Sequence, residues 1–144
     1  MKRIMMVVVL LIGILFISGC SSNPKPITYT KFIETFKDKD GFLTENQTLK
    51  YEDKFERCIE SSTDDVTFLY YEFKSEEKAR AYLEDNYKGR KKYRYSDNKK
   101  RIIVKCTDKM YFYAVQVDKS VVIGHTSNKK FKKVIKDIFK ELGY

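Results

Sequence analysis

The chain has one histidine, which limits the acid–base chemistry that its side chains can perform. His125 lies at the end of an aliphatic run, beside two hydroxyl residues, where an imidazole could act as a general base. One histidine cannot make a paired-histidine metal site, and a catalytic site needs several converging groups. The alternative for His125 is packing at the end of a strand. The sequence therefore predicts no enzyme, with His125 as the one exception to test, and no metal or cofactor.

A second group of side chains with binding chemistry lies between residues 90 and 101, where cations alternate with tyrosines. The segment joins positive charge to flat aromatic area, so it is the best candidate contact surface in the sequence. The alternative is a solvated loop and edge strand, whose cations discourage edge-to-edge aggregation. The residues of this candidate basic surface are Arg90, Lys91, Lys92, Tyr93, Arg94, Tyr95, Lys99, Lys100 and Arg101.

Cys20 ends the tetrapeptide Ile-Ser-Gly-Cys at positions 17–20, which closes an apolar run that follows two basic residues. A basic start, a short apolar stretch and small residues before the break describe a secretory signal. The run is shorter than the roughly 20 residues of a spanning helix. The tetrapeptide resembles the lipobox of bacterial lipoproteins, which implies cleavage before Cys20, a diacylglycerol on its thiol and anchorage on the outer face of the cell membrane. The alternative is an uncleaved signal anchor with an unmodified Cys20.

Three segments follow from this interpretation. Residues 1–19 are the predicted signal peptide, 20–27 the lipidated cysteine with a short tether, and 28–144 a single domain. The small, polar and proline residues after Cys20 cannot pack, and fully extended they reach only about 23 Å. The domain is therefore expected close to the lipid headgroups or to the inner layer of the wall.

The charge balance is basic. The full chain has 29 Lys and Arg against 20 Asp and Glu, so loss of two cations with the signal leaves 27 against 20 and a net charge of about +7. Beside an anionic leaflet, each cation that reaches the headgroups gains about 1 kcal/mol. We expect as partners the membrane, through the lipid anchor, and an envelope polyanion or another surface protein. Nucleic acid is not expected as a partner of an exported protein.

Cys58 and Cys106 are the other two cysteines. Because disulfides persist after export, the sequence predicts a bridge between them. That bridge would close a loop of about 48 residues, worth roughly 4 kcal/mol in the chain-entropy model. The alternative is two separate buried thiols, because a free cysteine packs as a small hydrophobe. Neither belongs to a Cys-x-x-Cys pair, so a thioredoxin-like role has no support.

Apolar periodicity predicts the elements of the first half of the domain. Phenylalanines at helical spacing between Thr28 and Gly41 predict a short helix. Residues 42–62 are ambiguous and allow a strand from Thr48 towards Ile59. The β-branched and aromatic run 66–73 predicts a strand buried on most of both sides, at the centre of the sheet.

The second half of the domain has clearer signals. Ser75 is placed to cap a helix that ends at Gly89. Two short connections join three strand candidates, residues 102–107, 110–117 and 120–125, so these strands should form an antiparallel meander. After Asn128, apolar residues at i, i+3, i+4 and i+7 predict a last helix packed on a sheet.

This order of elements predicts an α+β fold: a mostly antiparallel meander sheet with helices packed on one face, in a ferredoxin-like or cystatin-like variant. The motif Phe-x-Ser-Glu-Glu-Lys-Ala at 73–79 and the terminal Lys-Glu-Leu-Gly-Tyr resemble the small uncharacterised lipoproteins of low-GC Gram-positive bacteria. That resemblance carries no activity and no site residues. We expect a non-enzymatic module that contacts a protein or an anionic envelope component through the basic surface. The alternative is a small-molecule-binding domain with a tyrosine-lined pocket between sheet and helices.

Overall fold

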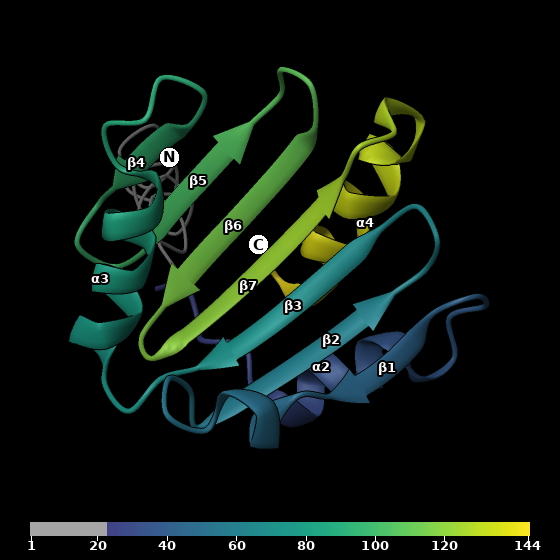
Figure 1. The fold of residues 1–144 in the computed structure, drawn as a ribbon, viewed down its shortest axis with the longest axis horizontal. Helices are drawn as coiled ribbons and strands as arrows, with labels where there is room; N and C mark the ends of the chain where they lie inside the picture. Colours follow the sequence, from purple (N-terminus) through teal and green to yellow (C-terminus); the bar gives the residue numbers. More distant parts are fainter. Residues whose placement is uncertain (1–22) are drawn as a thin grey trace, which may run out of the picture.

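Seven antiparallel strands form one sheet in a computed structural model, which describes residues 23–144 (Figure 1). Two meanders, β1 to β3 and β4 to β7, join where β3 pairs with β7, giving the order β1-β2-β3-β7-β6-β5-β4. The α+β class and the antiparallel sheet expected from the sequence are thereby confirmed. The strands are β1 (Leu43–Asn46), β2 (Arg57–Ser62), β3 (Thr67–Glu72), β4 (Arg94–Asp97), β5 (Ile102–Cys106), β6 (Tyr111–Val117) and β7 (Ser120–Thr126).

Among the described residues, three helices pack on this sheet, and side chains cap two of them, at Thr28 and at the predicted cap Ser75. The Thr28 side chain accepts a hydrogen bond from the amide of Lys31, and Ser75 does the same for Lys78. Each cap satisfies one of the backbone donors that a helix leaves unpaired in its first turn. The helices are α2 (Tyr29–Lys37), α3 (Glu76–Tyr87) and α4 (Lys132–Leu142), and two single 3₁₀ turns are η1 (Thr48–Tyr51) and η2 (Lys129–Phe131).

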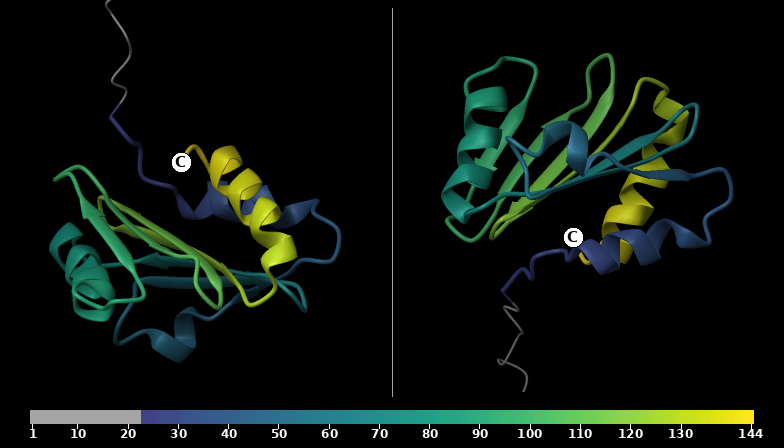
Figure 2. Two further views of the ribbon diagram at one scale, coloured as in Figure 1. Left: turned by 90° about the horizontal axis from the view of Figure 1, so that it is seen from above. Right: turned by 60° about the horizontal axis from the view of Figure 1, so that its bottom comes forward.

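The helices lie on both faces of the sheet, whereas the sequence led us to expect them on one. Helices α2 and α4 cover one face and α3 covers the other (Figure 2). The reason lies in the central strands, because β7 is buried on both sides: Val122 belongs to the core under α2 and α4, and Val121 and Ile123 to the core under α3. A single helical layer would leave one of these apolar surfaces in water.

The ambiguous region 42–62 holds two strands and a 3₁₀ turn instead of one long strand. Leu49, which favoured a strand from Thr48, is 86% exposed, and Phe55 is buried beside η1 instead of in a strand. β2 begins only at Arg57. The run 66–73 does form β3, but β3 is the third strand of seven and β7 is the central one.

Candidate functional site

Cys58 and Cys106 are both buried and free, so the predicted disulfide is wrong. Cys58 lies on β2 and Cys106 on β5, four strand positions apart, and at about 4.8 Å for each position this is about 19 Å. A disulfide needs Cα atoms within about 7 Å. The alternative of two separate buried thiols describes the structure. Cys20, the predicted lipid attachment site, lies outside the described residues.

The predicted basic surface, residues 90–101, is divided by β4. Arg90, Lys91 and Lys92 are exposed in the loop before β4, whereas Lys100 and Arg101 follow it in the turn to β5. The four residues of β4 put about 10 Å between these two ends (Figure 1). The cations at the two ends therefore belong to separate surfaces, and Arg94 lies between them on β4.

The two tyrosines of the segment do not add aromatic area to either cationic surface. The Tyr93 ring packs 4.9 Å from the Tyr87 ring and 5.4 Å from the Phe112 ring, measured between centroids. The Tyr95 hydroxyl is buried without a hydrogen-bond partner among the described residues. Both side chains pack with the core on the α3 side, so only the cations of the segment remain for contact with a partner.

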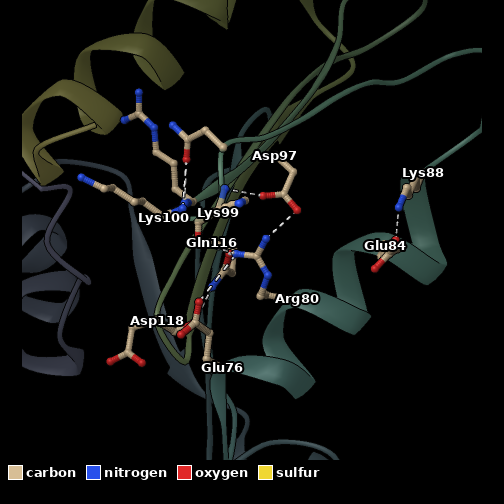
Figure 3. A network of polar contacts seen from close by, with 11 residues as sticks. Glu76, Arg80, Glu84, Lys88, Asp97, Lys99, Lys100, Gln116 and Asp118 are labelled. Atoms are coloured by element: carbon tan, nitrogen blue, oxygen red, sulfur yellow. Dashed lines mark hydrogen bonds and ion pairs between the residues drawn. The ribbon is translucent and has the colours of Figure 1, made fainter.

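A polar network fixes the turn that carries Lys100 and Arg101 (Figure 3). Arg80 of α3 forms an ion pair of 2.5 Å with Asp97 and donates to the carbonyl oxygen of Lys99 at 3.3 Å. The hydrogen bond from the Arg80 guanidinium lowers the pKa of Asp97, because it favours the ionised form of this carboxylate. The side-chain oxygen of Asn98 accepts hydrogen bonds from the backbone amides of Lys100 and Arg101.

Beside this turn lies a groove that we call the tether-side groove, because residues 23–28 form one of its walls. It has a volume of about 830 Å³, and α2, the β4–β5 turn and the end of α4 complete it. Lys25, Lys31, Lys100 and Arg101 line it, and none of its lining residues, all from the described part of the chain, is Asp or Glu. Cations without nearby carboxylates create a positive potential that attracts anions.

The groove brings together residues from opposite ends of the sequence. Ile27, which the sequence placed in the tether, is 5% exposed and donates its amide hydrogen to the Tyr144 hydroxyl at 3.3 Å. Lys100 donates to the side-chain oxygen of Asn23. Sequence analysis missed Lys25 and Lys31 as part of the site. Their proximity to Cys20 was the available signal, but only the fold places them opposite Lys100.

The same side of the sheet holds a second cationic hollow, of about 260 Å³, between α4 and strands β5 and β6. Lys105 and Lys136 line it together with aromatic side chains. The Lys105 ammonium lies 5.1 Å from the centroid of the Tyr113 ring, within the range of a cation–π contact. Positive charge on this side therefore extends beyond the tether-side groove.

The α3 side carries a different site: two adjoining hollows, which we call the tyrosine hollows. Their volumes are about 370 Å³ and 210 Å³, and both are lined by Leu69, Tyr71 and Tyr82. Tyr71 stacks on Phe55 with centroids 4.4 Å apart and ring planes 14° apart. The hollows exist because α3 covers β5 to β7, whereas only the short segment around η1 covers β2 and β3 on this side (Figure 2).

The walls that the two tyrosine hollows share, formed by Leu69, Tyr71 and Tyr82, are uncharged at neutral pH. Burial raises the pKa of Tyr71, Tyr82 and Tyr87, so all three phenols keep their protons. Burial also raises the pKa of the Cys58 thiol, to about 11, which makes the thiolate scarce at pH 7. Charged side chains line only the larger hollow, which includes Lys50, Lys54 and Glu60.

His125 lines the smaller tyrosine hollow, where burial lowers its pKa and the charge of Glu60 opposes this effect in part. Among residues 23–144, no hydrogen bond joins the His125 ring to another residue. In the strand register Phe112 of β6 lies between His125 of β7 and Cys106 of β5. Cys58 is two strands away from β7 and aligns with Val121, four residues from His125. The structure therefore brings His125 to an aromatic hollow and separates it from both thiols.

Within residues 23–144, no group of three or more His, Cys, Asp or Glu side chains could hold a metal ion. In the same residues, no helix has the length and apolar character needed to cross a membrane.

Comparison with known proteins supports the fold. No protein family matches the chain, and no curated protein matches it in sequence. Among solved structures, it resembles a GTP-binding regulator from Thermotoga maritima, with a TM-score of 0.51 and 12% sequence identity over 83% of this chain and 89% of that one. At such low identity the similarity concerns the α+β fold alone.

Proposed function

We propose that this protein is a lipid-anchored, extracytoplasmic binding module whose tether-side groove contacts an anionic component of the cell envelope. Lipidation of Cys20 would hold residues 23–28 next to the membrane, and these residues form a wall of the groove. The role is binding without catalysis. The partner, an anionic envelope component, is the class expected from the sequence. The proposed contact differs, because it includes only the end of segment 90–101 that contains Lys100 and Arg101.

One observation carries the proposal: the four cations of the tether-side groove have no carboxylate partner. The ion pairs among the described residues involve none of Lys25, Lys31, Lys100 and Arg101. Asp97, the carboxylate nearest in sequence to Lys100 and Arg101, is paired with Arg80. Unpaired cations on a shared concave surface are free to pair with a polyanion, and salt should weaken that pairing.

The test uses the chain from residue 20 onward with Cys20→Ser, which removes the lipid anchor but keeps every described helix and strand. We would measure its retention on isolated envelopes as salt is raised. We expect Lys100→Glu with Arg101→Glu to lower retention strongly, because charge reversal at two cations turns attraction into repulsion. The matched control, Lys91→Glu with Lys92→Glu, makes the same change in net charge at the other end of β4.

The comparison of the two double variants decides the proposal. Loss of retention in the Lys100 and Arg101 variant alone would support the tether-side groove as the contact. Equal loss in both variants would mean that retention depends only on net charge. Unchanged retention in both would contradict the proposal. Circular dichroism and thermal unfolding of each variant would show whether the fold is intact.

A second candidate function, binding of a small molecule, is favoured by the larger tyrosine hollow. Its volume of about 370 Å³ lies within the range of about 300–1,000 Å³ of ligand pockets, and its walls combine aromatic rings with the charged side chains of Lys50, Lys54 and Glu60. Leu69→Trp would fill the space shared by both hollows. Native mass spectrometry of protein purified from its own cells should then show a bound compound in the wild type that the variant lacks. A wild-type spectrum without bound compound would count against this function.

A further inference from the structure

The tether-side groove lies at the point where the folded domain meets its proposed anchor. The Ile27 side chain is buried, and the Ile27 amide donates a hydrogen bond to the hydroxyl of Tyr144. Asn23 contacts Lys100. The segment from Asn23 to Thr28 therefore lies along the domain and lines the groove instead of extending away from it.

This arrangement shortens the distance between the groove and the membrane. Only three residue steps separate Cys20 from Asn23, and a fully extended chain covers about 10 Å in three steps. If Cys20 carries a lipid, as the proposed function requires, the cations of the groove lie within reach of the phospholipid headgroups. A wall polymer is farther away than the headgroups of the leaflet that holds the anchor.

We propose that the tether-side groove docks on the phosphodiester headgroups of anionic lipids in the anchoring leaflet, so that the domain lies on the membrane in one orientation. This deepens the proposed function and rests on it. Charge complementarity supports this occupant. Each anionic headgroup carries one negative charge, and the groove offers four cations without a carboxylate side chain among its lining residues: Lys25, Lys31, Lys100 and Arg101. Each cation at the surface is worth about fivefold in the partition constant.

The orientation has a consequence for the other face. The tether and the groove are on the side of α2 and α4, and α3 is on the opposite side of the sheet (Figure 2). Docking through the groove therefore turns the tyrosine hollows away from the membrane. The hollows would then be open to soluble ligands while the cationic side is covered by lipid.

Acetylation of native lysines tests this docking without any substitution. The lipidated full protein, inserted in preformed vesicles, would be treated briefly with a membrane-impermeant acetylating reagent and digested for mass spectrometry. One vesicle type holds phosphatidylcholine alone and the other phosphatidylcholine with phosphatidylglycerol. We expect Lys25, Lys31 and Lys100 to react several-fold more slowly on the anionic vesicles, whereas Lys91 and Lys92, in the loop before β4, react equally on both.

Two further arms separate the sources of negative charge. High salt should restore the reactivity of the groove lysines, because the contact is electrostatic. Soluble polyphosphate, added to the protein on phosphatidylcholine vesicles, tests a polymeric anion. Protection by polyphosphate but not by phosphatidylglycerol would overturn headgroup docking and leave the proposed function standing. Protection by neither would overturn both, and equal protection of Lys91 and Lys92 on anionic vesicles would overturn the single orientation.

A pair of variants provides an independent check. Lys100→Gln with Arg101→Gln removes half of the groove cations and should restore the reactivity of Lys25 and Lys31 on anionic vesicles. Lys91→Gln with Lys92→Gln removes the same charge elsewhere and should leave the protection unchanged. If the first pair left Lys25 and Lys31 fully protected, the four cations would not act as one headgroup site.

Discussion

The two faces of the sheet are built differently, and β3 shows the difference within four residues. Phe68 and Tyr70 point to the side of α2 and α4, where they are 0% and 1% exposed. Leu69 and Tyr71 point to the α3 side, where they are only half-buried and line the tyrosine hollows. Around β3, two helices close the first face, whereas one helix and a short 3₁₀ segment leave the second partly open.

The difference separates the region that stabilises the fold from the region that offers space to a small molecule. The closed face is filled by an aromatic cluster in which Phe36 packs 5.1 Å from Phe68 and Phe68 packs 6.1 Å from Phe139, measured between ring centroids. Close packing of this kind contributes most to the free energy of unfolding. The open face retains space beside the rings of Tyr71 and Tyr82. We expect substitutions in the aromatic cluster to affect stability and substitutions in the tyrosine hollows to affect binding of a small molecule.

The largest expected effect is the contrast between Phe68→Ala and Leu69→Ala. Phe68 is fully buried, so its truncation should cost about 3–5 kcal/mol of unfolding free energy. Leu69 is half-buried beside a hollow, and its truncation should cost about 1 kcal/mol. Urea unfolding monitored by circular dichroism measures both. Equal costs would mean that the two faces are packed alike.

Gly124→Ala probes how tightly the closed face is packed against β7. A methyl group at Gly124 would lie 2.8 Å from Phe68 Cε1 and 2.9 Å from Phe139 Cε2, closer than carbon atoms approach without a shift. Overpacking of this kind costs about 1–3 kcal/mol. Thermal unfolding should show a lower midpoint for the variant. An unchanged midpoint would show that Phe68 and Phe139 have room to move, which contradicts a closed face.

The closed face could largely be predicted from the sequence. Phenylalanines at helical spacing identified α2, and the apolar stripe after Asn128 identified α4. The edge strands could not be found in this way, because all four residues of β1 are exposed and show no alternation. In β4 only Tyr95 is even partly buried. Strands at the edge of a sheet have few core contacts, so hydrophobic patterning marks them weakly.

The sites were harder to predict than the fold, because they depend on which distant segments meet. The stretch 90–101 contains a run of cations, but the sequence does not show that β4 separates its ends. Nor does it show that Lys25 and Lys100 line the same groove. For α3, Ala79 and Leu83 identify the buried side of the helix without identifying which face of the sheet it covers. Pairing of strands far apart in sequence decides both questions.

The smallest expected effect is the contribution of His125, on the open face, to the pH dependence of the free energy of unfolding. Because burial lowers its folded-state pKa below the unfolded value of about 6.5, the unfolded chain binds more protons between these two pKa values. The free energy of unfolding should therefore fall as the pH is lowered from 7 through about 6.5. His125→Gln should flatten the curve from pH 7 to 5.5, as measured by urea titrations. An identical curve in the variant would place the ring in water.

The most direct test of the account is the intact mass of the protein purified from its membrane and alkylated after unfolding without reductant. Headgroup docking, the orientation of the two faces and the proposed function all require a lipidated Cys20. We predict a chain that begins at Cys20, carries at least a diacylglycerol, and is alkylated at both Cys58 and Cys106 because the two thiols are free. A chain that begins at Met1 with three alkylated thiols would contradict the account.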